Sequence, residues 1–446
     1  MAERMLGVRR DTIFAPASGV GRSAIDVVRI SGPDCAEALQ ALSPGAIFPD
    51  RVATLRTLYD PETREPLDRA LIVRFVAPRS FTGEEMAELH VTGGRAVLAG
   101  VMTALGKTPG LRPADPGEFA WRAFESGKLD LAEIEGLADL VDAETAVQRR
   151  QALRIAGGAL SREADALRAR LIRAMAVLES QIDFSDVEDA ESLSLRDARL
   201  IATEASDRIR AILVSARSGE RLRDGLSVVI AGPPNVGKST LMNALSKREV
   251  SIVSATPGTT RDLIEVSLDL DGYPVTLIDT AGIRDTNDPI EREGVERARR
   301  RSAEADLTLW LTESESPIEH EPFGPSLRVI TKQDQATQTN QAREGVPLRI
   351  SAKTGDGLSE LLGEITRFAA IQFAATSSTL ITTERHRIAF TDAQAALARA
   401  LDLDLEAVEL VAEDLRLAAR ALDRIAGRID VEDVLGDIFS RFCVGK

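Results

Sequence analysis

The residues of this chain best suited to chemistry form a loop, Gly232-Pro-Pro-Asn-Val-Gly-Lys-Ser-Thr240, with the spacing G-x-x-x-x-G-K-S. An apolar run, Leu226 to Ala231, precedes the loop, and a helical pattern, Leu241 to Leu245, follows it. In that context glycines let backbone amides surround phosphates, the lysine reaches the β- and γ-phosphates, and the serine hydroxyl ligates Mg²⁺. Without the upstream strand, the same letters would describe a glycine-rich turn before an ordinary helix. The sequence therefore predicts a phosphate-binding loop (P-loop).

Two further segments predict contacts with the γ-phosphate and the metal ion. Pro257-Gly-Thr-Thr-Arg-Asp262 contains Thr260, which is suited to ligate Mg²⁺ and to sense the γ-phosphate. Asp279-Thr-Ala-Gly282 follows an apolar strand pattern, Val275 to Ile278. Asp279 would hold Mg²⁺ through the water shell of the ion, and Gly282 would bring a backbone amide near the γ-phosphate.

Two more segments predict recognition of the base. Thr331-Lys-Gln-Asp334 follows an apolar strand pattern, and Asp334 can accept hydrogen bonds from N1–H and the 2-amino group of guanine. Adenine lacks both donors, so a carboxylate left unpaired would penalise ATP. Ser351-Ala-Lys353 would support the base. Any one of these tetrapeptides can be a plain turn or a helix cap, but all five segments in order predict a GTP-binding domain.

Three positions bear on hydrolysis. Ile283 stands where Ras-like enzymes place a water-orienting glutamine, so another group must act. Glu291 is the predicted catalytic residue, acting directly or through a water, and a solvated charge at a helix start is the alternative. No arginine finger is obvious, and Asn235 offers a carbonyl oxygen for a monovalent cation beside the phosphates. The sequence predicts activation by K⁺ and poor activation by the smaller Na⁺.

Thr331 departs from the usual Asn-Lys-x-Asp pattern of the base-recognition segment. Threonine keeps a hydroxyl but lacks the second polar atom of an amide. Rho-type GTPases carry a similar Thr-Lys-x-Asp. We therefore expect guanine selectivity to survive and base affinity to be lowered.

Composition limits the classes of protein to consider. With 446 residues the chain is long enough for two to four domains, and its apolar content of 44% and charged content of 28% are those of a globular protein. No run approaches a membrane span, and the N-terminus lacks the apolar core of a secretion signal. The two cysteines lie far apart in sequence, and no Cys/His cluster has zinc spacing. We expect a cytoplasmic protein. The net charge of −15 argues against broad nonspecific binding to nucleic acid.

Periodicity predicts the elements that position these residues. Residues 8–125 mix short β-like runs, such as Ala24 to Ile30, with helical patterns, such as Cys35 to Leu42. Residues from about Lys128 onward are helical, and helical periodicity returns from Thr383 to Phe442. Between these stretches strands and helices alternate, which indicates a parallel sheet. The predicted fold is therefore multidomain, with an α+β N-terminal domain, a discontinuous helical domain and an inserted α/β domain of the Ras-like P-loop class.

Several motifs outside the P-loop resemble the tRNA modification GTPase MnmE (TrmE) family over nearly the whole chain. The motifs are Asp11-Thr-Ile-Phe-Ala15, Val28-Arg-Ile-Ser-Gly32, Ser80-Phe-Thr-Gly-Glu84, Pro116-Gly-Glu-Phe119, Arg122-Ala-Phe124, Gly127-Lys-Leu-Asp-Leu131 and the terminal Phe442-Cys-Val-Gly-Lys446. In isolation the terminal pentapeptide would be a frayed helix end. Paired with a GTPase insertion, it is close to diagnostic of the family.

The resemblance implies four segments and a reaction. The segments are a folate-binding and dimerisation domain over 1–126, helical parts over 127–219 and 378–446, and a G domain over 220–377. The resemblance also implies a homodimer whose G domains pair with K⁺. With an FAD-binding partner, MnmG (GidA), in a heterotetramer or larger complex, such a protein modifies C5 of the wobble uridine (position 34) in certain tRNAs. A tetrahydrofolate derivative (5-formyl- or 5,10-methylene-tetrahydrofolate) supplies the carbon of an aminomethyl or carboxymethylaminomethyl group.

The resemblance also assigns residues to ligands. Those expected to bind GTP are Asn235, Val236, Gly237, Lys238, Ser239, Thr240, Ser254, Thr259, Thr260, Asp279, Thr280, Ala281, Gly282, Thr331, Lys332, Asp334, Ser351, Ala352 and Lys353. Mg²⁺ would be held by Ser239 and Thr260, and K⁺ by Asn235, Ser254, Thr256 and Thr259. Glu291 matches the proposed catalytic acid of the family. Folate would be bound by Arg29, Glu88, Lys128 and Lys446, of which the first three would otherwise be read as surface charges.

Three questions stay open at the level of sequence. Cys443 is either a nucleophile or a neighbour of the folate, and we expect a supporting role because a reactive thiol needs a lowered pKa. An Era-type ribosome-assembly switch shares the P-loop spelling, but that class usually adds a basic RNA-binding appendage, whereas this chain is acidic and ends in the FCVGK motif. A dynamin-like membrane remodeller would favour a lipid-binding patch, and none is evident, so no membrane association is expected.

Overall fold

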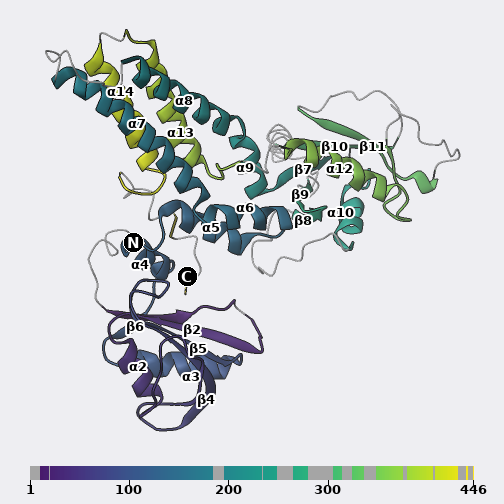
Figure 1. Ribbon diagram of the computed structural model, residues 1–446. Helices are drawn as coiled ribbons and strands as arrows, with labels where there is room; N and C mark the ends of the chain where they lie inside the picture. Colours follow the sequence, from purple (N-terminus) through teal and green to yellow (C-terminus); the bar gives the residue numbers. More distant parts are fainter. Residues whose placement is uncertain are drawn as a thin grey trace, which may run out of the picture. The chain divides into compact units, whose positions relative to one another are not determined.

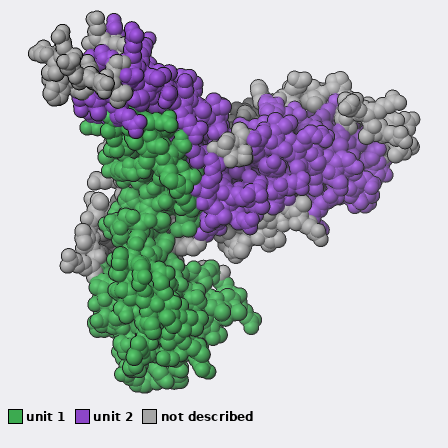
Figure 2. All heavy atoms as spheres, viewed as in Figure 1, with its two compact units in different colours: residues 1–138, 155–172, 419–446 green, residues 139–154, 173–418 purple. Residues whose placement is uncertain are grey.

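The computed structural model describes residues 11–19, 21–183, 195–233, 235–248, 265–279, 305–313, 324–335, 348–374, 379–404, 407–429, 438–439 and 445. The chain divides into two compact units (Figure 2). Unit 1 comprises residues 1–138, 155–172 and 419–446, and unit 2 comprises residues 139–154 and 173–418. Each unit is therefore built from segments that are distant in sequence.

Unit 1 contains a six-stranded sheet in the order β3-β4-β5-β2-β1-β6 (Figure 1). Its strands are β1 (Thr12–Pro16), β2 (Ile25–Ser31), β3 (Thr54–Tyr59), β4 (Pro66–Phe75), β5 (Met86–Thr92) and β6 (Leu111–Pro113). All neighbours pair antiparallel except β1 and β6. The helices α2 (Cys35–Leu42) and α3 (Arg95–Gly106) cover the sheet and close a core that includes Val28, Ile30 and Leu89.

Buried and half-buried side chains alternate along β2, so one face of the strand packs on the core and the other can contact a ligand. Asp26, Val28 and Ile30 are buried, whereas Val27 and Arg29 between them are only half-buried. The predicted strand near Ala24–Ile30 and the predicted helix Cys35–Leu42 are confirmed. Unit 1 also contains α4 (Glu118–Glu125), and Trp121 of that helix packs edge-on against Phe439 near the end of the chain.

Unit 2 contains a second six-stranded sheet in the order β12-β11-β10-β7-β9-β8 (Figure 1). Its strands are β7 (Leu226–Ala231), β8 (Glu265–Leu270), β9 (Tyr273–Asp279), β10 (Leu307–Thr312), β11 (Ser326–Ile330) and β12 (Leu348–Arg349). Every described pair is parallel except β8 with β9. The associated helices are α10 (Lys238–Ser246), α12 (Leu358–Gln372) and the short 3₁₀ helix η2 (Gln333–Gln335). The central strands are buried apolar runs, as expected of a parallel sheet covered on both faces.

The remaining helices come from both sides of this sheet in sequence. They are α5 (Leu131–Asp142), α6 (Ala146–Ala156), α7 (Ala159–Asp183), α8 (Leu195–Val214), α9 (Ala216–Asp224), α13 (Glu384–Asp402) and α14 (Val408–Asp423). α8 and α13 lie side by side, and the Gln394 amide donates to Ser206 Oγ at 2.8 Å between them (Figure 1). The predicted helical stretches on both sides of the sheet are confirmed for these elements, while the four domain boundaries stay a prediction. No helix within the described ranges is long and apolar enough to span a membrane.

Candidate functional site

The P-loop joins β7 to α10 with the backbone that its glycines permit. Gly232 has a φ of 144°, and a Cβ there would lie 2.4 Å from the carbonyl oxygen of Leu311 on β10. Gly237 has a φ of 104° and directly precedes the first residue of α10. Both positions favour glycine because side chains rarely adopt these angles. The loop therefore lies at the carboxyl end of a central parallel strand, where α/β sheets bind ligands.

Two predicted phosphate and metal residues lie on adjacent elements. Lys238 Nζ donates to the carbonyl oxygens of Gly232 at 2.9 Å and Pro233 at 3.0 Å, so its ammonium folds back over the loop. Ser239 Oγ donates to Asp279 Oδ2 at 3.0 Å. Asp279 ends β9, which pairs with β7, so the sheet brings together residues 40 positions apart. A hydroxyl and a carboxylate oxygen are the hard donors that Mg²⁺ prefers.

Thr331 has a role in the structure that the sequence did not reveal. Its hydroxyl donates at 2.7 Å to the carbonyl oxygen of Val236 in the P-loop and lies 3.3 Å from the carbonyl oxygen of Thr312. The residue is only 6% exposed. The threonine thus ties the segment predicted to recognise the base to the P-loop, through a contact that needs one hydroxyl rather than an amide.

The base-recognition segments also meet each other. Ser351 Oγ donates to Asp334 Oδ1 at 2.8 Å, and Ser351 itself is fully buried. The hydrogen bond from the buried Ser351 therefore fixes the orientation of the exposed Asp334 carboxylate. Lys332 has a left-handed φ of 58°, and its ammonium pairs with Glu313 beyond the end of β10. Ala352 and Lys353 follow Ser351 in the same turn.

Part of the predicted site lies outside the described residues. These positions are Ser254, Thr256, Thr259, Thr260, Thr280, Ala281, Gly282, Glu291 and, near the end of the chain, Cys443 and Lys446. Of the predicted K⁺ ligands, Asn235 is described, and it adopts a left-handed φ of 61° within the P-loop.

Two predicted folate residues form an ion pair across β2 and β5. Arg29 and Glu88 are register partners, and Arg29 Nη2 lies 2.9 Å from Glu88 Oε1. The Arg29 guanidinium also lies over the rings of Phe81 and Phe119, at 5.2 and 5.8 Å from their centroids. Glu88 Oε2 lies 3.6 Å from His90 Nε2. The pair is half-buried on one face of the sheet.

The terminal motif reaches this site. Arg29 Nη1 donates to the carbonyl oxygen of Gly445 at 3.3 Å. Gly445 has a φ of 105°, and a Cβ there would lie 1.9 Å from the carbonyl oxygen of Pro16, so only glycine fits. Lys128 is exposed, and its Cε would lie 3.4 Å from a Cβ placed on Gly83 in the turn before β5. The structure therefore brings Arg29, Glu88 and Gly445 together and places Lys128 against a neighbouring turn.

A charge network centred on the buried Arg122 and Glu118 lies in the same unit. Arg122 donates to Asp11, Glu84 and Glu118, and Arg112 donates to Asp11 and Glu118. Partial burial alone would raise the pKa of Glu118, but the hydrogen bond from Arg112 and the charge of Arg122 lower it below its ordinary value. Asp11 is less buried than Glu118. Burial raises the pKa of Asp11, but the hydrogen bonds and charges of Arg112 and Arg122 together lower it below its ordinary value. The sequence motifs contained four of these residues, but only the fold shows that they share one network.

Comparisons with known proteins cover both units. Residues 12–128 match the model described as "GTP-binding protein TrmE N-terminus", and residues 131–443 match "MnmE helical domain". A tRNA modification GTPase MnmE of Beijerinckia indica is 54% identical over 98% of this chain and 96% of its own length. One from Rhodopseudomonas palustris is 51% identical over 98% and 99%. Among solved structures, Era of Aquifex aeolicus is 29% identical over 32% of this chain and 56% of its own, with a TM-score of 0.26.

The P-loop at the end of β7, Asp279 at the end of β9 and the Asp334–Ser351 pair define a P-loop GTPase. The full-length relatives and the two family models add the rest of the chain to that class. The chain belongs to the MnmE (TrmE) family of tRNA modification GTPases. It is a GTP-binding enzyme of tRNA modification.

Proposed function

We propose that this chain is a K⁺-activated GTPase that acts with an FAD-binding partner of the MnmG type. Together they add an aminomethyl or carboxymethylaminomethyl group to C5 of the wobble uridine, with a tetrahydrofolate derivative as one-carbon donor. The observation that carries the proposal is the presence of two sites in one chain: the Ser239–Asp279 pair at the P-loop and the Arg29–Glu88 pair beside Gly445. A nucleotide switch alone would not need the second site.

In the nucleotide site Lys238 would bind the phosphates, and Ser239 with Thr260 would hold Mg²⁺. The hard oxygens of Ser239 and Asp279, 3.0 Å apart, suit that ion. When bound, Mg²⁺ neutralises charge on the phosphate oxygens. Asp334, oriented by Ser351, would accept the two guanine donors. Glu291 would orient or deprotonate the attacking water, since Ile283 cannot.

The proposed K⁺ site has one described ligand. Asn235 would offer its side-chain oxygen, with Ser254, Thr256 and Thr259 contributing from a segment that lies outside the described residues. The left-handed backbone of Asn235 supports the assignment, because a non-glycine residue holds that conformation at a cost that local function can justify. A cation there would add positive charge beside the phosphates.

Hydrolysis measured in KCl and in NaCl at equal ionic strength tests the cation. We expect turnover to be at least about tenfold higher in KCl, and Asn235→Ala to remove most of that difference, as removal of a charge-stabilising group does. Lys332→Ala, outside the proposed cation site, is the matched control and should keep the salt preference. Equal turnover of the unmodified protein in both salts contradicts K⁺ activation.

The proposed folate site uses Arg29, Glu88, Lys128 and Lys446. The structure pairs Arg29 with Glu88, so we propose that Arg29 orients this carboxylate toward pterin N–H donors, while the Lys128 and Lys446 ammoniums bind the glutamate tail. The half-buried pair and the neighbouring Phe81 ring support a flat heterocyclic ligand. Calorimetric titration with 5-formyl-tetrahydrofolate should give saturable binding that Glu88→Gln weakens. Unchanged affinity in that variant contradicts the site.

The proposed assembly is a homodimer formed through the N-terminal domain, joined by the partner in a heterotetramer or larger complex. Mass photometry of the chain alone and with the partner tests it, with a dimer mass and a larger mixed complex as the expected results. The Era-type alternative is not favoured, because the curated relatives that match 98% of this chain are named tRNA modification GTPases.

A further inference from the structure

The N-terminal turn of α6 carries a reciprocal capping arrangement. Gln148 Oε1 accepts hydrogen bonds from the backbone amides of Glu144 at 3.1 Å and Thr145 at 3.0 Å. In return, Thr145 Oγ1 accepts from the backbone amide of Gln148 at 3.3 Å. Either glutamine or glutamate can complete such a capping box, because capping uses only a side-chain oxygen. Glutamine differs from glutamate in carrying an amide nitrogen that can donate a further hydrogen bond.

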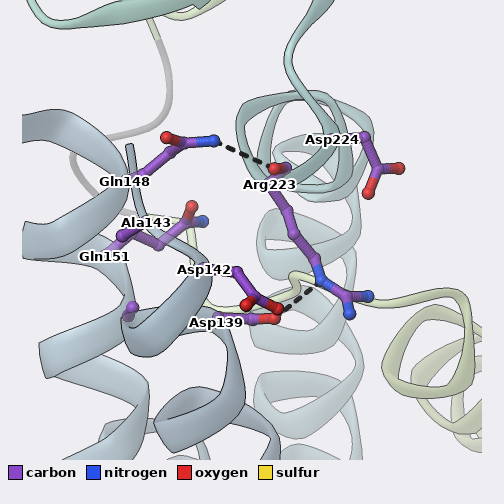
Figure 3. Close-up of a pocket in the computed structure, with 8 residues that line it drawn as sticks. Asp139, Asp142, Ala143, Gln148, Gln151, Arg223 and Asp224 are labelled. Carbon is purple, nitrogen blue, oxygen red and sulfur yellow. Dashed lines mark hydrogen bonds and ion pairs between the residues drawn. The ribbon is translucent and has the colours of Figure 1, made fainter. Parts of the chain in front are cut away.

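That nitrogen reaches α9. Gln148 Nε2 donates at 3.0 Å to the carbonyl oxygen of Arg223, and Arg223 Nε donates at 2.7 Å to Asp139 Oδ1 at the end of α5 (Figure 3). Arg223 belongs to the last turn of α9, and β7 begins at Leu226, directly after Gly225. The last carbonyls of a helix need donors from outside it, and glutamine supplies one here.

The neighbouring Val147 contacts a second strand. Val147 packs against the core of the nucleotide-binding sheet, and a Cβ on Gly272 would lie 3.1 Å from its Cγ2. Asp271 and Gly272 form the two-residue turn between β8 and β9, with φ values of 55° and 90°. Both angles are positive, as in the hairpin turns that suit twisted strands. The turn directly precedes Tyr273, the first residue of β9.

α6 thus contacts the two segments that lead directly into β7 and β9, a pair of strands whose other ends carry the nucleotide chemistry. β7 runs into the P-loop, β9 ends at Asp279, and the two pair in parallel from Leu226 with Val275 to Ile230 with Asp279. We propose that Gln148 and Arg223 are positioning residues that hold α6 to the base of this strand pair and couple nucleotide-dependent change at the P-loop to tRNA modification. This inference rests on the proposed function, but it concerns the ends of the strands opposite the nucleotide.

Packing makes such coupling physically reasonable. Val228 and Ile230 of β7 and Leu277 of β9 are fully buried, so the strands cannot deform independently of the core. Close-packed interiors transmit displacements through rigid elements rather than absorbing them. A shift at the P-loop end of β7 is therefore expected at its base, where the Gln148 bond either holds α6 or releases it.

Two features beside the contact between Gln148 and Arg223 would allow that contact to rearrange. It borders a pocket of about 180 Å³ lined by polar side chains, among them Asp139, Asp142 and Asp224 (Figure 3). Gln151 lines the same pocket, is 8% exposed, and its Nε2 has no hydrogen-bond partner within the described part of the chain. A buried donor left unpaired is uncommon, and the aspartates that line the same pocket are acceptors that it does not use in this structure.

Gln148→Glu in the full-length chain tests the inference. The variant keeps the capping oxygen but loses the donor to Arg223, and it adds a carboxylate beside three aspartates. With the partner, tRNA and substrates, one measures kcat and KM for GTP together with wobble uridine modified per GTP hydrolysed. We expect kcat and KM within about twofold of the unmodified chain and modification per GTP lowered about threefold or more. Arg150→Gln, which makes the same charge change at an exposed position of α6, should leave all three values unchanged.

The outcomes separate the inference from the proposed function. If the wild-type chain does not modify wobble uridine, the proposed function is wrong. If it does, and Gln148→Glu lowers turnover and modification in parallel, or lowers neither, the positioning role is wrong. Should Gln148→Glu fail to fold, Arg223→Ala gives the same test through the ion pair to Asp139, and Arg223→Lys should restore coupling because it keeps the charge.

Discussion

Ser239 Oγ donates a 3.0 Å hydrogen bond to Asp279 Oδ2, which joins the first turn of α10 to the last residue of β9. The bond exists because β7 and β9 are neighbours in the parallel sheet, so both residues emerge at one edge. Asp279 is almost fully buried and is therefore held in place before any ligand arrives. The pair is the part of the nucleotide site that the fold fixes most firmly.

Removal of the Ser239 hydroxyl should impair hydrolysis more than folding. Ser239→Ala deletes an oxygen that we assign to Mg²⁺, so we expect kcat to fall by about a hundredfold, the cost of losing one charge-stabilising group. Ser239→Thr keeps the hydroxyl and should retain most activity. Steady-state phosphate release at saturating Mg²⁺ measures both. Full activity in the alanine variant would exclude the assigned role.

The Thr331 hydroxyl should support nucleotide affinity through the P-loop. Thr331→Val preserves the shape but leaves the Val236 carbonyl without its donor, so we expect GTP to bind about five- to tenfold more weakly, equivalent to about 1 kcal/mol. Thr331→Ser keeps the donor and serves as the control. Titration with a fluorescent GTP analogue measures the affinities. Equal affinity in the valine and serine variants would show that the contact is dispensable.

The charge network around Glu118 should make unit 1 sensitive to acid. The pKa of Glu118 is lowered in the folded state, so this carboxylate stabilises the fold above its ordinary pKa, and the contribution is lost as the pH falls below that value. Glu118→Gln should lower the free energy of unfolding by about 2 kcal/mol at pH 7, since it breaks a buried pair with Arg112 and Arg122. Urea unfolding at several pH values measures this, with the exposed Glu37→Gln as control. A difference from the unmodified chain that stays constant down to pH 3 would contradict the linkage.

Cys35 should be chemically inert in the folded chain. Burial raises the pKa of its thiol to about 12, and the side chain has no exposed surface. Since only the thiolate reacts, a Cys443→Ser chain should show no labelling by a thiol reagent at pH 8 and one labelled thiol in denaturant. Rapid labelling of the native variant would mean that Cys35 is accessible.

The sequence predicted the elements that carry strong local signals. The strand from Leu226 to Ala231 and the helix from Cys35 to Leu42 are confirmed to the residue, because apolar runs and helical periodicity are properties of short segments. No comparable local signal marks the strand Leu307–Thr312, although it lies near the centre of the sheet and its Leu311 carbonyl requires a glycine at position 232. Its neighbours in the sheet include β7, a strand about 80 positions earlier in the sequence, and such a pairing leaves no local signal.

Contacts between distant segments set the limit of prediction at the site. Lowered base affinity at Thr331 stays a prediction, and the sequence does not show the hydrogen bond from its hydroxyl to the P-loop carbonyl of Val236. The resemblance assigns Arg29 and Glu88 to folate, but the sequence does not show that they are register partners on β2 and β5 and form an ion pair. The spacing of Thr145 and Gln148 is that of a capping box, but the second hydrogen bond of Gln148 cannot be read from sequence because its partner is 75 positions away.

The most direct measurement is mass spectrometry of wobble uridine in tRNA from cells that lack the gene for this chain. The account predicts that the aminomethyl or carboxymethylaminomethyl group disappears and that the wild-type gene restores it. A Lys238→Ala version should not restore it, because the lysine that folds over the P-loop is lost. Wobble uridine that keeps its modification in the deletion strain would contradict the central claim.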